Sequence, residues 1–386
     1  MKSQNVIIIG SGVAGLATAL FLKKAGMEST IYESRSDEEL ETGAGFLLSP
    51  NGVKILDGIG CKNEVIANAT VIKKIQQINS ENEVEAIFHN YSEKYYDAPL
   101  LNVMRDQIIQ SLLKEVHRQG IEVTYNKKLT SIKQQPHSVQ VLFEDETVIT
   151  GDIVIGADGT FSKTREAIAF NAKLDYSGFW GLQGVSFVKD FVLDEATSYF
   201  YNDGNFQFIF GKAHPTNKMN ILWQAFSQCP EKLPTKHFEK ANKETIRQLL
   251  YKQMEGWNIP KHLFAIIDHT EMFFPRSIYE IKNLSVWSKG RVVLVGDAVH
   301  TANPFVGQGA SYSLEDAMLI AKMLRDHDYR DAFYYYEKDR RKRTEELNAL
   351  FQHMSIQNEI DKKTPLMLKS GVSCVFSVHR GSHRSN

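Results

Sequence analysis

Short apolar runs and a helix-like segment alternate at the start of the chain. Residues 6–9 form a run typical of a parallel strand that is covered on both faces. A glycine-rich turn at residues 10–15 follows, and residues 16–24 are good helix formers that end before Gly26. Residues 30–32 predict a second strand. This order is the opening unit of a doubly wound α/β sheet.

Later segments switch between the periodicities of strands and helices. Alternating residues predict antiparallel strands near 83–88 and through 171–226, and buried strands end at 153–155 and 291–295. Helical spacing appears at 108–116, 245–254, 314–321 and 334–351. We therefore predict an α/β fold: a Rossmann-like, three-layer domain interrupted by an antiparallel β-sheet domain, with a long C-terminal helix. Residues 1–70, 97–170 and 271–330 are assigned to the first domain, 71–96 and 171–270 to the β domain, and 331–386 to the C-terminal helix and tail.

Composition and charge narrow the classes of partner. The chain has 386 residues, 42% of them hydrophobic, and its 45 Lys and Arg nearly balance 46 Asp and Glu. A formal net charge of -1 gives no general attraction to nucleic acid or to an anionic membrane. The basic stretch at residues 338–343 is interpreted as a solvated helix face. We expect a monomer or dimer that binds neither nucleic acid nor membrane.

Cysteine usage and hydropathy indicate the compartment. The three cysteines are far apart and follow no metal-binding or redox spacing, as is usual in a reducing cytoplasm. No run approaches the length of a membrane helix, and glycine breaks the N-terminal apolar run too early for a signal peptide. We expect a cytoplasmic protein without a metal site.

The first candidate site is the glycine-rich turn. Gly10 allows a sharp turn, Gly12 lets the backbone approach a pyrophosphate, and Gly15 lets the helix pack on the strand. Glu33, at the end of the second strand, can accept the hydroxyls of an adenosine ribose and favours FAD or NAD over NADP. The motif alone does not separate FAD from NAD. The predicted contacts are Gly10, Gly12, Val13, Ala14, Gly15, Glu33, Ser34 and Arg35.

Two further turns carry acidic residues at strand ends. Asp158 precedes a glycine after the strand at 153–155, a pattern that by itself is a common turn. Asp297 ends the strand at 291–295, where such folds bind ligands, and can accept a ribityl hydroxyl. A glycine-rich loop at 307–311 then enters a helix, whose N–H groups can stabilise negative charge on a flavin.

These three motifs, in this order, resemble the p-hydroxybenzoate hydroxylase family of single-component FAD-dependent aromatic monooxygenases. Length and architecture also resemble its tetracycline-inactivating and its salicylate- and urate-hydroxylating branches. Ser311 departs from the asparagine usual at its position, and Phe161 from the polar residue often found there. The resemblance implies FAD contacts beyond the first motif at Gly45, Phe46, Arg105, Asp158, Asp297, Pro304, Gly307, Gln308, Gly309, Ala310 and Ser311.

The resemblance also implies an activity. NAD(P)H, as a transient co-substrate, would reduce FAD, and dioxygen would then form a flavin C4a-hydroperoxide that hydroxylates a small aromatic or enolic molecule. No universal catalytic residue is expected, so the catalytic base is unknown, and His300 is interpreted as structural. Two alternatives stay open: an FAD-dependent reductase of the isoprenoid-lipid type and a non-catalytic flavoprotein.

The substrate pocket is expected on the β domain, where alternate residues of each strand share one face. No arginine occurs in residues 171–226, which argues against a simple benzoate as substrate, although Arg276 follows soon after. The predicted pocket residues are Gln183, Gln207, Phe208, Trp223 and Gln224.

Overall fold

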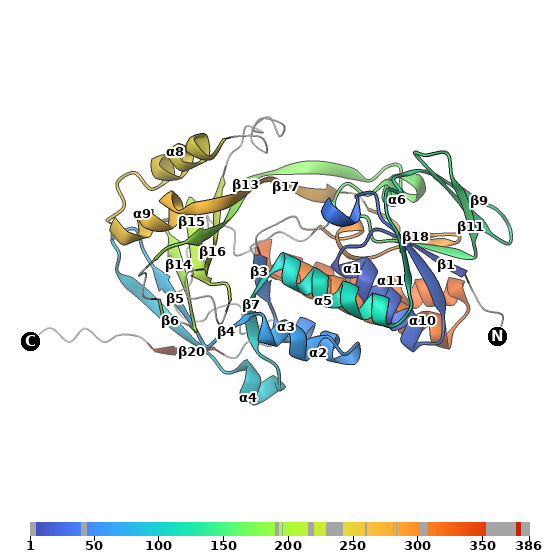
Figure 1. The fold of residues 1–386 in the computed structure, drawn as a ribbon, viewed down its shortest axis with the longest axis horizontal. Coiled ribbons are helices and arrows are strands. Elements are labelled where there is room, and N and C mark those ends of the chain that lie inside the picture. The colour runs from blue at the N-terminus through green and yellow to red at the C-terminus, as the bar shows by residue number, and fades with distance from the viewer. Residues whose placement is uncertain are drawn as a thin grey trace, which may run out of the picture.

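The computed structural model describes residues 5–39, 45–189, 193–194, 196–214, 220–228, 242–258, 261–282, 284–301, 307–352 and 376–379. Its helices fall into a group near the parallel sheet and a pair beside the β domain (Figure 1). The first group is α1 (Val13–Lys24), α2 (Pro50–Gly58), α3 (Lys62–Ala67), α5 (Arg105–Arg118), α6 (Lys163–Ile168), α10 (Gly309–Asp326) and α11 (Tyr329–Gln352). The pair is α8 (Lys243–Gln253) and α9 (Lys261–Asp268), and a short helix α4 (Ser92–Tyr96) lies apart.

A six-stranded sheet forms the centre of the first domain. Its strands run in the order β18 (Ser288–Lys289), β19 (Val292–Leu294), β12 (Ile153–Gly156), β1 (Asn5–Ile9), β2 (Glu28–Tyr32) and β8 (Glu122–Thr124). All neighbours pair in parallel except β18 with β19. Residues 6–9 of β1 are buried because layers cover both faces of the sheet.

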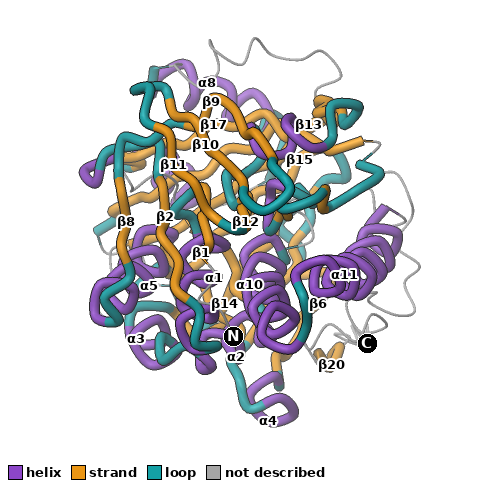
Figure 2. Tube along the Cα trace, turned by 90° about the vertical axis from the view of Figure 1, so that its right-hand side faces the viewer, coloured by secondary structure: helices purple, strands orange, loops and turns teal. Residues whose placement is uncertain are grey.

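Three layers make up this domain. Helices α1, α5 and α10 lie on one side of the parallel sheet, and the three-stranded sheet of β11 (Val148–Gly151), β10 (Val139–Phe143) and β9 (Leu129–Gln134) lies on the other (Figure 2). The centre of the Phe143 ring lies 5.1 Å from that of the Tyr32 ring, and this contact joins the three-stranded sheet to the parallel sheet. The predicted three-layer α/β fold is confirmed.

The β domain is an eight-stranded sheet. Its order is β17 (Thr270–Lys282), β13 (Lys173–Phe187), β16 (Asn220–Gln228), β15 (Phe206–Lys212), β14 (Thr197–Asn202), β5 (Lys74–Ile78), β6 (Val84–Asn90) and β20 (Phe376–His379). Neighbours are antiparallel except β14 with β5. The long strands β13 and β17 run side by side from this sheet toward the first domain (Figure 1).

Two features of this sheet differ from the sequence prediction. The predicted boundary at residue 271 assigned β17 to the first domain, but β17 pairs with β13 along the β domain. We therefore propose a boundary after Lys282. Part of the tail, which the sequence left unplaced, forms β20 on the free edge of β6. No helix in the part of the chain that the structure describes is long and apolar enough to cross a membrane.

The β sheet has two different faces. Trp223 and Phe208 lie on the face covered by α8 and α9 and are 0% and 1% exposed. The indole Nε1 of Trp223 lies 3.0 Å from the hydroxyl oxygens of both Ser186 and Thr270, so its polar atom is satisfied inside this core. Trp223 and Phe208 were predicted to line the substrate pocket. That prediction is wrong, because both side chains point into the domain core, away from the first domain.

The opposite face continues toward a small three-stranded sheet of β3 (Gly45–Leu48), β7 (Leu100–Met104) and β4 (Thr70–Ile72). Leu47 packs there with Ile75 and Phe200 of the large sheet. Met104 joins Val185 and Leu222 in a separate apolar cluster. The small sheet thus connects the β domain to the first domain.

Close packing of the core predicts the effect of a single methyl group. A Cβ at Gly184 would lie 2.3 Å from the Trp223 ring, whereas a Cβ at Gly181 would lie 3.0 Å from the Phe226 ring. We expect Gly184→Ala to lower the free energy of unfolding by about 1–3 kcal/mol, and Gly181→Ala by less, since overpacking forces a rigid ring to shift. Urea denaturation of both variants checks this order, and equal losses would contradict it.

Candidate active site

The glycine-rich turn joins β1, β12 and α1. Gly10 has φ +102°, and a Cβ there would lie 2.6 Å from the carbonyl oxygen of Ala157. A Cβ at Gly15 would lie 1.9 Å from the carbonyl oxygen of Gly10, so only glycine allows this close packing. A Cβ at Gly12 would meet nothing within 4 Å, and no side chain caps α1 there. The N–H groups of the first turn of α1, which includes Val13 and Ala14, therefore border open space that suits an anion.

Glu33 follows β2 and turns back to this glycine turn. Its carboxylate accepts hydrogen bonds from the N–H and hydroxyl of Ser11, both at 2.8 Å, from the Ser34 hydroxyl at 3.1 Å, and from the N–H and Nε of Arg35 at 3.0 and 3.1 Å. Burial alone would raise the pKa of Glu33, but the Ser11 and Arg35 donors outweigh it and lower the pKa to about 2.

The acceptor capacity of Glu33 is therefore fully used by the protein. A carboxylate offers about four acceptor sites, so a ribose hydroxyl has to replace one of the present donors. The accessible donors are Ser34, which is exposed, and the Arg35 side chain, which is 37% exposed. Glu33 thus has the predicted location, ionised and adjacent to the glycine turn.

Asp158 is positioned within its own turn. Its carboxylate accepts from the Ser162 hydroxyl at 2.5 Å and from the N–H and hydroxyl of Thr164 at 2.9 and 3.0 Å. Burial raises the pKa of Asp158. These bonds hold the start of α6, so we propose that Asp158 supports the site through its turn.

Arg165 is a residue of this turn whose role sequence reasoning missed. It is 4% exposed, and its guanidinium donates to the carbonyl of Ala298 at 3.0 Å and to that of Thr160 at 2.7 Å. Arg165 thereby ties the Asp158 turn to the Asp297 turn. The signal for this role in the sequence was the position of Arg165 on the first turn of a short helix that follows an Asp-Gly turn.

Residues from four separate segments meet near Asp297. Asp297 is half-buried in the 3₁₀ turn Gly296–Ala298 that follows β19. Burial lowers the pKa of Arg105, while the Asp297 carboxylate raises it and the Arg35 guanidinium lowers it. The Arg105 guanidinium also lies 5.9 Å from the centre of the Phe46 ring. The structure therefore brings together the predicted residues Arg35, Phe46, Arg105 and Asp297.

In the glycine-rich loop before α10, the Gln308 side chain bonds to other protein residues, although it was predicted to contact FAD. Gln308 is 3% exposed, and its Nε2 donates to the Ser49 hydroxyl at 2.6 Å. The Asn51 amide nitrogen donates to Glu315 at 2.8 Å and to the Gln308 side-chain oxygen at 3.3 Å. The Gln308 side chain therefore fixes α2 against α10. Pro304 lies outside the described residues.

The start of α10 nevertheless offers unsatisfied polar groups. Gly309, Ala310 and Ser311 form its first turn, and no side chain caps it. Gly307, just before it, has φ +60° and open space where a Cβ would lie. Buried polar atoms that have no hydrogen-bond partner among the described residues gather in these segments: Asn51 Oδ1, His300 Nδ1, Thr301 Oγ1, Ser311 Oγ and Tyr312 Oη. Because such atoms are costly to leave unpaired, they indicate a place for a polar ligand.

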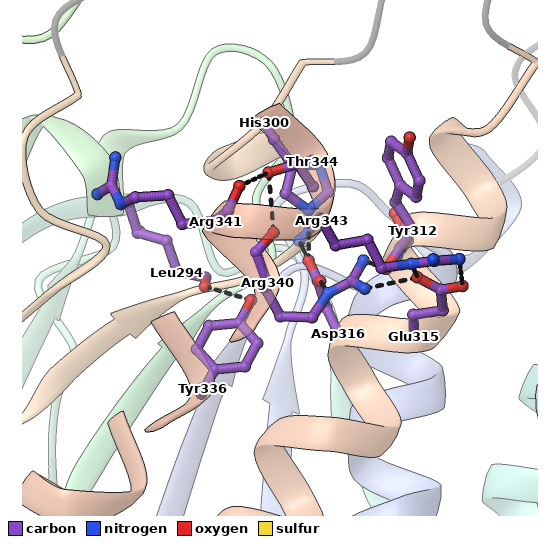
Figure 3. A network of polar contacts seen from close by, with 12 residues as sticks. Leu294, His300, Tyr312, Glu315, Asp316, Tyr336, Arg340, Arg341, Arg343 and Thr344 are labelled. Carbon is purple, nitrogen blue, oxygen red and sulfur yellow. Dashed lines mark hydrogen bonds and ion pairs between the residues drawn. The ribbon is translucent and has the colours of Figure 1, made fainter. Parts of the chain in front are cut away.

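A buried ionic network supports this loop from behind. The Asp316 carboxylate accepts from the N–H of Gly296 at 2.8 Å, from His300 Nε2 at 2.6 Å and from Arg340 Nε at 2.6 Å. Arg340 also bonds Glu315 at 2.5 Å. Figure 3 shows Arg340 reaching from α11 to both acids of α10. His300 is held by Asp316 in this network, as its structural interpretation requires.

The interpretation of residues 338–343 as a solvated face is wrong for Arg340. Arg340 is 2% exposed, and Arg343 also bonds Glu315 at 2.6 Å. The buried positions Phe333, Tyr336 and Arg340 follow one another at helical spacing. That spacing was the signal in the sequence, but the surrounding charges obscured it.

The three glutamines among the predicted pocket residues share the sheet face that meets the first domain. Gln183 Nε2 donates to the carbonyl of Gly45 at 3.1 Å. Gln224 is the direct partner of Gln183 across β13 and β16, and Gln207 lies on β15 beside them. All three are half-buried. The structure thus places Gln183 against the segment that contains Gly45 and Phe46, with Gln224 beside it on the next strand.

Comparisons with known proteins agree with this arrangement. The family model described as "FAD binding domain" matches residues 3–349. The chain is 28% identical to a 6-hydroxynicotinate 3-monooxygenase of Pseudomonas fluorescens, with 90% of both chains covered. Its fold is similar to that of Klebsiella pneumoniae HpxO, described as complexed with FAD and uric acid, with a TM-score of 0.81, 22% identity and coverage of 93% of this chain and 90% of that one. The tetracycline destructase Tet(51) has a TM-score of 0.70 and 20% identity, with 96% and 95% covered.

The ionic network predicts a pH dependence of stability. Burial alone would raise the pKa of Asp316, but His300 and Arg340 outweigh it and lower the pKa to about 2. A carboxylate with a lowered folded-state pKa stabilises the fold above its unfolded pKa, near 4, and this stability is lost as the pH falls toward 2. Asp316→Asn should remove that acid dependence and cost about 3–5 kcal/mol at neutral pH, because Arg340 loses a buried partner.

Urea denaturation between pH 2 and pH 7 measures both effects. Asp326→Asn, at the exposed end of the same helix, is the matched control. An Asp316→Asn variant that follows the control at every pH would contradict the prediction.

Proposed function

The chain belongs to the FAD-binding domain family, and from that premise we propose that it uses NAD(P)H and dioxygen to hydroxylate a small aromatic or enolic substrate. It is an FAD-dependent monooxygenase, like relatives such as the 6-hydroxynicotinate 3-monooxygenase and the 3-amino-4-hydroxybenzoate 2-monooxygenase. The single observation that carries the proposal is the family match over residues 3–349. The co-substrate and the substrate class are the proposed part.

The residues of the site fit FAD. The uncapped start of α1, beside the open space at Gly12, suits the pyrophosphate. We propose that Glu33 binds the adenosine ribose and that Asp297, with Arg105 nearby, binds the ribityl chain. The start of α10 has no side-chain cap, and the Ser311 hydroxyl has no hydrogen-bond partner in the described part of the chain; both suit the polar edge of the flavin ring.

FAD, when bound, supplies the electron transfer from the nicotinamide to dioxygen and the delivery of one oxygen atom. The chain's own residues bind, orient and exclude water. The helix dipole and N–H groups of α10 favour negative charge at the flavin edge. The apolar side chains Val185 and Leu222 exclude water beside Gly45, while Gln183 and Gln224 orient a substrate.

We propose that NAD(P)H binds only transiently. The sequence contains one glycine-rich dinucleotide turn, and FAD occupies it in this account. The nicotinamide then has to approach the flavin without a Rossmann unit of its own.

Glu33→Ala should weaken FAD binding. The variant leaves ribose hydroxyls and the Ser11 and Arg35 donors without an acceptor, a loss on the order of 1–3 kcal/mol, or about 5- to 150-fold in the dissociation constant. Titration of the apoprotein with FAD measures the change. Glu28→Ala, at the exposed start of β2, the strand that precedes Glu33, is the control. Equal affinities of the two variants would show that Glu33 does not contact the cofactor.

The proposed reaction is tested with labelled dioxygen. The purified protein should be yellow with about one noncovalent FAD per chain. A panel of phenols and enolic heterocycles, beginning with uric acid and 6-hydroxynicotinate, is tested for substrates. A substrate should accelerate NADPH oxidation, and its product should contain one labelled oxygen atom. A product that forms without label, or that has a reduced carbon–carbon double bond, would contradict hydroxylation.

A further inference from the structure

Two glutamines form a directly opposed pair on the sheet face that meets the first domain. Gln183 of β13 and Gln224 of β16 are register partners, as are their neighbours Val185 and Leu222. Directly opposed side chains in an antiparallel sheet have Cβ atoms about 5 Å apart. Two carboxamides at this spacing can bind the same small molecule.

Contacts with β3 fix where this pair lies. Gln183 Nε2 donates to the carbonyl of Gly45 at 3.1 Å. A Cβ on Gly45 would lie 2.6 Å from Leu222 Cδ2, so backbone and side chain are in close contact. Arg105, beside Asp297, starts the helix that directly follows β7, the strand paired with β3. The glutamine pair therefore borders the segment proposed to lie along the flavin.

Most of the hydrogen-bonding capacity of the pair is unused. Gln183 uses one N–H group on Gly45, which leaves its second N–H and its oxygen. The Gln224 carboxamide, with two donors and an acceptor oxygen, has no hydrogen-bond partner among the residues that the structure describes. Both side chains are half-buried and keep an accessible part. Together they offer a donor and an acceptor side by side.

Near the pair, the same face of β13, β16 and β15 carries no formal charge. Alternate residues of a strand share one face of a sheet, so the register shows which residues lie on the face of the pair. All of those near the pair are uncharged: Gly181, Gln183, Val185, Phe187, Leu222, Gln224, Phe226, Gln207, Ile209 and Gly211. Arg276 of β17 is opposite Gly181 and exposed. A carboxylate bound between the two glutamines would exchange water for neutral carboxamides, which is unfavourable, and Arg276 is exposed to solvent and already interacts with another residue.

We propose that the Gln183–Gln224 pair recognises a ring amide, so that the substrate is a neutral nitrogen heteroaromatic with adjacent ring N–H and C=O groups. This inference rests on the proposed function and names its substrate class. The ring N–H donates to one carboxamide oxygen, and the ring carbonyl accepts from a carboxamide N–H. The apolar neighbours Val185 and Leu222 contact the ring itself. A site built on such bonds discriminates strongly against molecules that cannot form them.

The experiment compares three bicyclic probes of similar size on the FAD-loaded enzyme. 2-Quinolone has the ring amide, 2-naphthol has only a hydroxyl, and 2-naphthoate has a carboxylate. Perturbation of the flavin absorbance gives each dissociation constant. We expect 2-quinolone to bind at least about tenfold more tightly than 2-naphthoate, the equivalent of one hydrogen bond gained or one charge left unpaired.

Two variants assign the preference to the pair. Gln224→Leu should weaken 2-quinolone binding about tenfold, through the loss of one hydrogen bond, and leave 2-naphthol within about twofold. Unchanged 2-naphthol binding also shows that the variant is folded. Gln76→Leu is the matched control, because Gln76 pairs with Tyr199 on the opposite face of the same sheet. It should leave all three constants unchanged.

The outcomes separate this inference from the proposed function. Tighter binding of 2-naphthoate, equal effects of Gln224→Leu on all probes, or no binding of 2-quinolone to the yellow enzyme would overturn the inference. Each of these leaves the enzyme an FAD-dependent monooxygenase. A protein that carries no FAD would instead overturn the proposed site as a whole.

Discussion

The Asp316 carboxylate is the group on which the geometry of the site depends. It is 0% exposed and joins three segments: the backbone after β19 at Gly296, the His300 ring and the Arg340 guanidinium of α11. Burying such charges has a high desolvation cost, so the network contributes less to net stability than to a defined geometry. The C-terminal helix α11 is thereby part of the support of the Asp297 turn.

The junction between the two domains explains why one chain can hold both a dinucleotide and a small substrate. The parallel sheet presents α1, Glu33 and Asp297 at the carboxyl ends of its strands, where α/β folds bind ligands. The long strands β13 and β17 bring the glutamine face of the β sheet to Gly45 on β3. Cofactor and substrate residues come from different sheets, and β3 and β7 lie between them.

The local features of the fold could be predicted from sequence, because they depend on neighbours in the chain. The turn between β1 and α1 follows from Gly10 and Gly15, whose side-chain hydrogens alone fit beside Ala157 and the turn backbone. Features that depend on contacts between distant segments could not be predicted from the sequence. Strand alternation groups Gln183, Gln207 and Gln224 on one face and Phe208 and Trp223 on the other, but only the position of α8 and α9 decides which face is the core.

Charged residues show the same limit. Arg340 stands among other basic residues, and its burial depends on Glu315 and Asp316 of the preceding helix. Asp158 matched a cofactor motif, yet its carboxylate is used by Ser162 and Thr164. The motif located the turn correctly, whereas the role of each side chain depended on partners that the spacing does not reveal.

A crystal structure of the protein with its own cofactor tests the central claim most directly, that the glycine turn, Glu33 and Asp297 together hold FAD. The account predicts the pyrophosphate at the start of α1, a ribose hydroxyl within hydrogen-bond distance of Glu33 in place of the Ser34 or the Arg35 side chain, and the flavin ring between Gly45 and the start of α10. A dinucleotide bound elsewhere, or a ribose out of reach of a Glu33 still bonded to Ser11 and Arg35, would contradict it.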